Sequence, residues 1–329
     1  MFEAFLKRHD AAAWARACAA LVPSIHEVDR NATDIWFHFF PLNLAQAFAQ
    51  TADAERLARE LRLDGRHRLA EQSDISHWFL YGHRYWPLVK AVIIRRAESL
   101  TAISSLELTD IIREMAKEAA RAAGANEPLL LGITAVGVMT LQQVGIAAFR
   151  AGSPATQTAA PLAPTTPDQI VAARKKDDRQ GLAGVFRGIR SQYTVTFDER
   201  RTDGRFMIIN QQQLTTAAAN DTRDYSSSGP RTCHEGPIPV ECRTASCGTC
   251  WVGILGGAEK LSEVEEMEAR RMKEFGYVNS AERKPIIRLA CMAAASGNVT
   301  IVIPPWNGFL GKKGLGRPSL VRPSGPVPV

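Results

Sequence analysis

Cysteines are the residues of this chain whose type and spacing point most directly to chemistry. Three of them, Cys242, Cys247 and Cys250, follow the spacing C-x4-C-x2-C, and a fourth, Cys291, stands well after them. Thiolates bind soft metal centres such as zinc and iron–sulfur clusters. The residues between the first three are mostly small, so backbone N–H groups could turn toward bound sulfur. The pattern predicts a metal centre held by four thiolates, three from a tight loop and one from a separate segment.

The spacing C-x4-C-x2-C with a distant fourth cysteine is that of a plant-type [2Fe–2S] cluster. A zinc site is the main alternative, but zinc sites usually combine C-x2-C with a second C-x2-C or with H-x3-5-H. Here Cys291 stands alone, and of the histidines only His234 lies near the cysteines. A disulfide framework is a poor match for a long chain without a secretory signal.

From about Gln192 to Pro305 the sequence resembles [2Fe–2S] ferredoxins, in their plant-type and adrenodoxin-like forms. The alternating run Tyr193–Phe197, a turn and Arg205–Ile209 look like the opening hairpin of a β-grasp domain. Three later apolar runs look like the strands that leave the cysteine loop, carry the last ligand and close the sheet. They are Trp251–Leu255, Ile286–Met292 and Asn298–Ile303. This resemblance implies a [2Fe–2S] cofactor with four ligands: Cys242, Cys247, Cys250 and Cys291.

Some features depart from the family pattern. Ala245 occupies a position where the family usually has Gly, so one backbone amide could be presented differently. The forty residues between Cys250 and Cys291 exceed the plant pattern and are closer to the adrenodoxin-like and bacterial branches. The polar segment 211–237 could cover the cluster, meet a partner or be an inert loop. The other two cysteines of the chain, Cys233 and Cys18, are expected to be a free thiol and a buried apolar residue.

The segment before Cys291 predicts a charged helix. Leu261-Ser262-x-x-Glu265 has the pattern of a capping box, which would open a helix that runs to about Phe275. Its charges could form a docking face, or a solvated face with acids first and bases last, as the helix dipole favours. The residues concerned are Glu263, Glu265, Glu266, Glu268, Arg270, Arg271 and Lys273.

The first 125 or so residues predict an all-α domain. Phe2–Leu21 is Ala-rich with apolar residues at helical spacing, and Glu107–Ala123 is an amphipathic pattern followed by Gly124. His77 and His83 lie in an aromatic stretch and suggest a haem or quinone site, although their spacing would place them on different helix faces. Packed histidines of the core or surface are the simpler interpretation, and no c-type haem motif is present.

The segment 129–149 contains no formal charge and is long enough to span a membrane. It lacks basic flanks and an aromatic belt, which favours a helix buried in the protein or against another subunit. A peripheral membrane contact through this segment remains an alternative.

These patterns predict an α+β multidomain protein with four parts. They are an all-α docking domain (1–150), a Pro/Ala/Thr linker with a short helix (151–185), a β-grasp [2Fe–2S] ferredoxin domain (186–305) and a basic Pro/Gly-rich tail (306–329). Net charge is +6, and the acidic and basic residues of the ferredoxin part nearly balance. A balanced surface argues against a freely diffusing carrier and for a subunit fixed in a complex.

The function we expect is one-electron transfer within or to a larger oxidoreductase, with redox proteins as partners. The sequence shows no dinucleotide motif, P-loop or hydrolase motif, so we expect no small-molecule substrate, and no nucleic-acid module. The alternative is a scaffold subunit whose cluster mainly stabilises the fold; a redox sensor is a third possibility. The absence of a signal core and the use of reactive thiolates favour the cytoplasm or the cytoplasmic face of a membrane.

Overall fold

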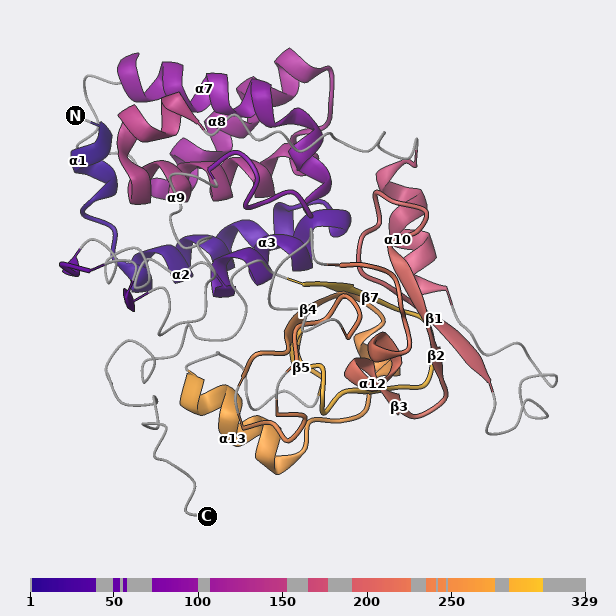
Figure 1. The fold of residues 1–329 in the computed structure, drawn as a ribbon. Coiled ribbons are helices and arrows are strands. Elements are labelled where there is room, and N and C mark those ends of the chain that lie inside the picture. Colours follow the sequence, from indigo (N-terminus) through magenta and orange to yellow (C-terminus); the bar gives the residue numbers. More distant parts are fainter. Residues whose placement is uncertain are drawn as a thin grey trace.

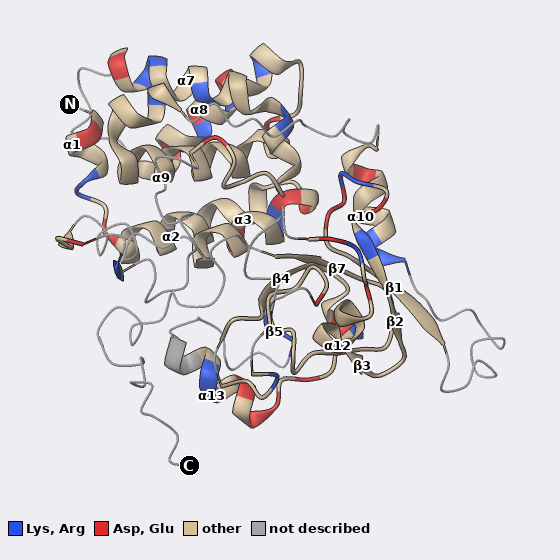
Figure 2. Ribbon diagram, in the orientation of Figure 1, with Lys and Arg blue, Asp and Glu red and all other residues tan. Residues whose placement is uncertain are grey.

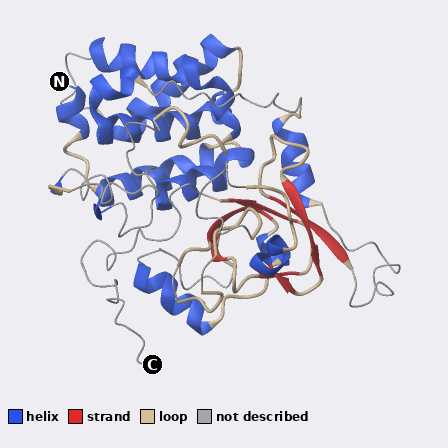
Figure 3. Ribbon diagram, viewed as in Figure 1, coloured by secondary structure: helices blue, strands red, loops and turns tan. Residues whose placement is uncertain are grey.

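The chain folds into a helical half and a half built on a β-sheet (Figures 1 and 3). The computed structural model describes residues 2–39, 50–53, 56–57, 73–99, 107–152, 165–176, 191–225, 235–240, 242–246, 248–275 and 284–303. This arrangement confirms the predicted α+β multidomain class. The boundaries of the four parts proposed from the sequence stay predictions, and residues 306–329 lie outside the described residues.

The helical half consists of helices packed around one long central helix. They are α1 Phe2–Leu6, α2 Ala11–Leu21, the 3-10 turn η1 Val22–Ser24, α3 Glu27–Phe39, the 3-10 turn η2 Tyr81–Tyr85, α7 Trp86–Ser99, α8 Leu108–Ala123 and α9 Glu127–Ala151. The helical stretch Phe2–Leu21 is divided into α1 and α2: the chain breaks after Leu6, because Asp10 caps a new helix by accepting from the Ala13 N–H at 2.8 Å. Gly124 ends α8 with φ +60°, as the sequence predicts.

Helix α9 contains the uncharged segment 129–149 and forms the centre of the helical half. Every residue from Leu129 to Leu141 is buried, against α7, α8 and α3. Of the helices in the described residues, α9 alone has the length and the apolar composition to cross a membrane. However, 72% of its most apolar 18-residue stretch is buried inside the protein. The helix breaks at Gly145 (φ +78°, ψ 159°), where the Glu3 carboxylate accepts from the Ile146 N–H at 2.7 Å and so caps the final turns.

The second half contains a five-stranded sheet of order β2-β1-β7-β4-β5 and a two-stranded sheet β3-β6. Its elements are α10 Pro167–Lys175, β1 Gln192–Thr196, β2 Arg205–Ile209, β3 Gln212–Gln213, α12 Leu214–Ala219, β4 Trp251–Gly256, the 3-10 turn η4 Ala258–Lys260, α13 Glu266–Phe275, β5 Ile287–Leu289, β6 Ala294–Ala295 and β7 Val299–Val302. β1 and β2 form the expected antiparallel hairpin, and β1 runs parallel to β7. A capping box at Thr166 and Gln169 opens α10, with Pro167 as its first residue.

The predicted helix before Cys291 begins later than the sequence suggests. Ser262 does not cap it, because its N–H donates to the Ala294 carbonyl (2.7 Å) and its Oγ accepts from the Ala294 N–H (3.2 Å). Leu261 pairs with Ala295 in an isolated bridge. This pairing extends the chain beside β6, so the helix α13 can begin only at Glu266.

Candidate metal centre

The pairing of β4 with β5 brings two of the candidate cysteines together. β4 begins directly after Cys250, β5 ends shortly before Cys291, and the two strands run antiparallel with Trp251 opposite Leu289. Beyond this register, the Ala290 N–H donates to the Cys250 carbonyl at 3.0 Å. Cys250 and Cys291 therefore lie at the same end of the sheet, and both are buried.

The sulfur atoms of this site lie within interaction distance of one another. The pKa of Cys291 is lowered by a hydrogen bond with the Cys250 side chain, and an N–H from Ala245 lowers it further. Burial and the nearby charges of Cys242 and Glu268 oppose this shift of the pKa. The thiols of Cys250 and Cys291 thus meet at one site, and Cys242 is near enough to act on Cys291 electrostatically, whereas Cys247 lies outside the described residues. None of these three thiols forms a disulfide.

The cysteine loop is wound so that backbone N–H groups face sulfur. Arg243, Ala245 and Gly248 all have positive φ values, of 53°, 59° and 71°. The Thr244 N–H lies 3.5 Å from the Cys242 sulfur. Ala245, which replaces the usual Gly, is buried in the left-handed conformation that Gly favours, and its N–H still reaches the Cys291 sulfur. The substitution therefore adds backbone strain, of about 1–2 kcal/mol, rather than removing a donor.

A buried ion pair supports the strand that leads to Cys291. The Arg288 guanidinium donates to both Glu268 oxygens at 2.9 Å, and its third bond goes to the Ser262 carbonyl at 2.7 Å. Glu268 also accepts from the Leu289 N–H at 2.8 Å. Both side chains of the pair are 0% exposed. The pair therefore fixes α13 against β5 at Arg288, three residues before Cys291.

The predicted docking face on α13 therefore needs one correction. Glu268 points into the core, because Arg288 is buried beneath the helix and needs a carboxylate partner. Glu263, Glu265 and Glu266 remain exposed, and Figure 2 shows this acidic stretch at the start of α13, with basic residues after it. The sequence did carry a signal for the pair, since Arg288 interrupts an apolar strand where a lone charge would be costly.

The histidines of the helical half form a pair, contrary to the expectation that they lie on different helix faces. His77 lies in a turn and His83 in η2, and their Nδ1 atoms are 2.9 Å apart. His77 also bonds through Nε2 to the Ser73 carbonyl at 3.1 Å and packs on Trp86. Burial lowers the pKa of both, that of His83 to about 4.

This pair is therefore neutral near pH 7 and structural in its contacts. The described residues contain no group of three His, Cys, Asp or Glu side chains placed to hold a metal ion, so the histidine pair has no third ligand; Cys247 of the cysteine motif is not among these residues. His38 bonds to its own helix at the Asp34 carbonyl. Burial raises the pKa of the Cys18 thiol, which fits the expected packing role. His67 and Cys233 lie outside the described residues.

Comparison with known families decides the nature of the cysteine site. Residues 208–296 match the family described as the 2Fe-2S iron-sulfur cluster binding domain. This part of the chain is a [2Fe–2S] cluster-binding domain. The match spans less than a third of the chain and does not extend to the helical half. No curated protein and no solved structure matches the chain.

The residues of this domain fit the cofactor. Thiols that form no disulfide lie at the end of the β4–β5 pair, and N–H groups of the loop point at their sulfur atoms, as an anionic cluster requires. The predicted [2Fe–2S] cofactor and the resemblance to ferredoxins are thereby confirmed. The assignment of individual cysteines as ligands is a proposal, developed next.

Proposed function

We propose that the chain is an electron-transfer subunit whose [2Fe–2S] cluster is held by Cys242, Cys247, Cys250 and Cys291. The observation that carries this proposal is the contact between the Cys250 and Cys291 thiols within the matched domain, with Cys242 near enough to act on Cys291 and with loop N–H groups directed at the sulfur atoms. When bound, an all-thiolate cluster of this kind supplies one-electron redox chemistry at low potential, about −400 mV in plant-type ferredoxins. The chain's own residues would hold the cluster, exclude water and set the potential.

The partners we propose are redox proteins of a larger oxidoreductase complex. A balanced surface charge on the cluster domain supports a fixed subunit rather than a charge-steered carrier. We further propose a location in the cytoplasm or on the cytoplasmic face of a membrane. Because Leu129–Leu141 are buried among other helices, α9 supports packing within the protein better than direct membrane contact. Fractionation of native membranes and cytosol, with identification of co-eluting subunits, tests the partners and the location together.

Reduction experiments separate electron relay from a scaffold role. The wild-type protein, purified under anaerobic conditions, should lose its visible bands on addition of dithionite, and a co-purifying partner should reoxidise it rapidly. A cluster that cannot be reduced, in a protein that still assembles with its partners, would instead identify a scaffold.

Single Cys-to-Ser variants test the ligand set. Substitution of Cys242, Cys247, Cys250 or Cys291 should abolish or severely deplete the bound iron, because serine is a poor ligand for it. Cys18→Ser is the matched control and should keep its iron, since Cys18 belongs to the helical half. Full iron content in any of the four variants would remove that residue from the ligand set.

A further inference from the structure

One face of the cluster-bearing sheet is covered by the helical half. Helix α3 packs along β4 (Figure 1). Asn31 donates to the Leu255 carbonyl at 3.4 Å, and the Ile35 side chain lies over Gly253. A Cβ at Gly253 would lie 2.7 Å from the Ile35 side chain, so this glycine permits the close approach. Alternate strand residues share a face, so Trp251 points to the same side as Gly253.

Trp251 links this covered face to the candidate metal centre. It directly follows Cys250 and is 0% exposed. By strand alternation its ring lies on the face of β4 that α3 covers at Gly253, next to Cys250. Solvent exposure is one of the factors that set the potential of an iron–sulfur cluster. The helical half can therefore influence the cluster by excluding water from the Trp251 side.

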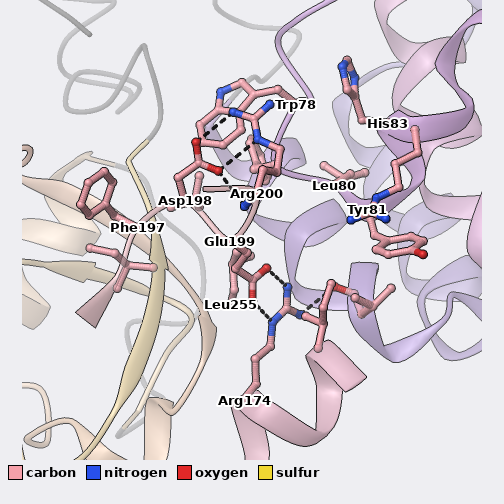
Figure 4. A pocket seen from close by; sticks show the side chains of 16 residues that line it. Trp78, Leu80, Tyr81, His83, Arg174, Phe197, Asp198, Glu199, Arg200 and Leu255 are labelled. Atoms are coloured by element: carbon pink, nitrogen blue, oxygen red, sulfur yellow. Dashed lines mark hydrogen bonds and ion pairs between the residues drawn. The ribbon is translucent and has the colours of Figure 1, made fainter. Parts of the chain in front are cut away.

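Arg174 on α10 ties the two halves together. Its guanidinium donates to the Val28 carbonyl of α3 (2.7 Å) and to both oxygens of Glu199 (2.9 and 2.6 Å), in the turn after β1. The side chain is 7% exposed, and it packs against Gly256, where a Cβ would lie 2.6 Å from the Arg174 Cβ. One residue thus joins α3, α10 and the β1–β2 turn, as Figure 4 shows.

A second contact closes the same junction. Arg200 stacks on the Trp78 ring of the helical half, 3.9 Å from its centroid, while it binds both oxygens of Asp198. Figure 4 shows the two arginine–carboxylate pairs side by side at the boundary. The cavity between them has a volume of about 30 Å³, which suits one or two water molecules rather than a cofactor. The junction is therefore a packed interface.

We propose that Arg174 is a positioning residue that holds the helical half over the cluster-bearing sheet and so keeps water from the Trp251 side of the cluster. This role rests on the proposed function, because it concerns the same cluster. Arg174 packs at the Gly256 end of β4, roughly 20 Å from the Cys250 end at about 3.3 Å per residue. At that distance the charge of Arg174, offset by the Glu199 carboxylate bonded to it, has little direct effect on the cluster. A response of the cluster to Arg174 must then pass through the covering helices.

The test compares full-length holoprotein variants prepared under anaerobic conditions. Arg174→Ala removes all three contacts, and Arg174→Lys keeps the charge with fewer bonds. Arg201→Ala is the matched control, because Arg201 lies in the same turn but pairs with Asp203 in an exposed ion pair. The double variant Arg174→Ala/Glu199→Ala removes the pair without leaving a charge unpaired, and it serves if the single variant fails to fold. Two quantities are measured: amide hydrogen exchange of Gly253–Leu255, and the midpoint potential of the cluster by an EPR-monitored titration.

We expect Arg174→Ala and the double variant to speed amide exchange at Gly253–Leu255 about tenfold or more. A change of this size corresponds to the loss of one charge-assisted hydrogen bond. Water reaching the cluster should favour its more negative reduced form and raise the one-electron reduction equilibrium constant about threefold or more. Arg174→Lys should give an exchange rate and a potential between those of wild type and Arg174→Ala, and Arg201→Ala should match wild type in both quantities. Unchanged exchange, or an unchanged potential despite faster exchange, would overturn the role of Arg174. A wild-type protein without a [2Fe–2S] cluster would overturn this role and the proposed function together.

Discussion

The buried pair Glu268–Arg288 should control the local stability of the segment that carries Cys291. Glu268 accepts two bonds from Arg288 and one from the Leu289 N–H, and both charged side chains are fully buried. In Glu268→Ala the Arg288 charge would stay in the core without its partner. Breaking a buried pair in this way costs about 3–5 kcal/mol. The double variant Glu268→Met/Arg288→Met replaces both charges by apolar side chains and should cost much less than Glu268→Ala.

Amide hydrogen exchange at Leu289 measures this effect directly, because that N–H donates to Glu268. At 1.4 kcal/mol per tenfold change, Glu268→Ala should speed Leu289 exchange by about 100- to 4000-fold. Exchange in the double variant should return most of the way to the wild-type rate. The measurement is best made on anaerobic holoprotein, since a bound cofactor makes global two-state unfolding a poor assay.

Glu266→Ala provides the matched control, because Glu266 lies on the same helix but is exposed. It should change Leu289 exchange by no more than a surface substitution does, within about 0.5 kcal/mol. Equal exchange rates in Glu268→Ala and Glu266→Ala would refute the reasoning that the pair anchors β5. A double variant as unstable as Glu268→Ala would show that the shape of the site, rather than the unpaired charge, accounts for the loss.

Three further predictions concern other sites. Burial lowers the pKa of His83 from 6.5 to about 4. The neutral buried imidazole therefore contributes about 3 kcal/mol to the free energy of unfolding above pH 6.5, and this contribution is lost as the pH falls toward 4. The difference in stability between wild type and His83→Gln, measured by thermal unfolding, should shrink over that range. Gly145→Ala should cost about 1–3 kcal/mol and speed exchange of the Ile146 amide, because φ +78° with ψ 159° is nearly exclusive to Gly, while equal exchange in the variant would argue against the helix break. Ala245→Gly should keep the bound iron, whereas the β-branched Ala245→Val should lose it, and full iron in the valine variant would contradict the tight loop.

Sequence reasoning predicted the parts of this protein that depend on local patterns. The cysteine spacing, the alternating strands β1 and β2 and the αL glycine after α8 each have a short-range physical cause, and the structure contains these strands and this helix end. The capping box of α10 is of the same kind. Local chemistry alone determines such features, so one sequence is enough to find them.

The features that the sequence did not predict depend on contacts between distant segments. The burial of Glu268 needs Arg288 from another strand, and the His77–His83 contact needs a turn followed by a 3-10 helix rather than one continuous helix. Ser262 has the pattern of a helix cap, yet the strand at Ala294 takes its hydrogen bonds. The docking of α3 on β4 likewise leaves no local pattern, because the small size of Gly253 matters only once Ile35, far away in the sequence, packs against it.

Quantitative iron, sulfide and zinc analysis of freshly isolated anaerobic protein, with EPR before and after dithionite, tests the central claim most directly. The account predicts about two irons and two inorganic sulfides per chain, no stoichiometric zinc, and a one-electron paramagnetic signal that appears on reduction. Colourless protein that contains one zinc per chain and gives no signal would contradict it.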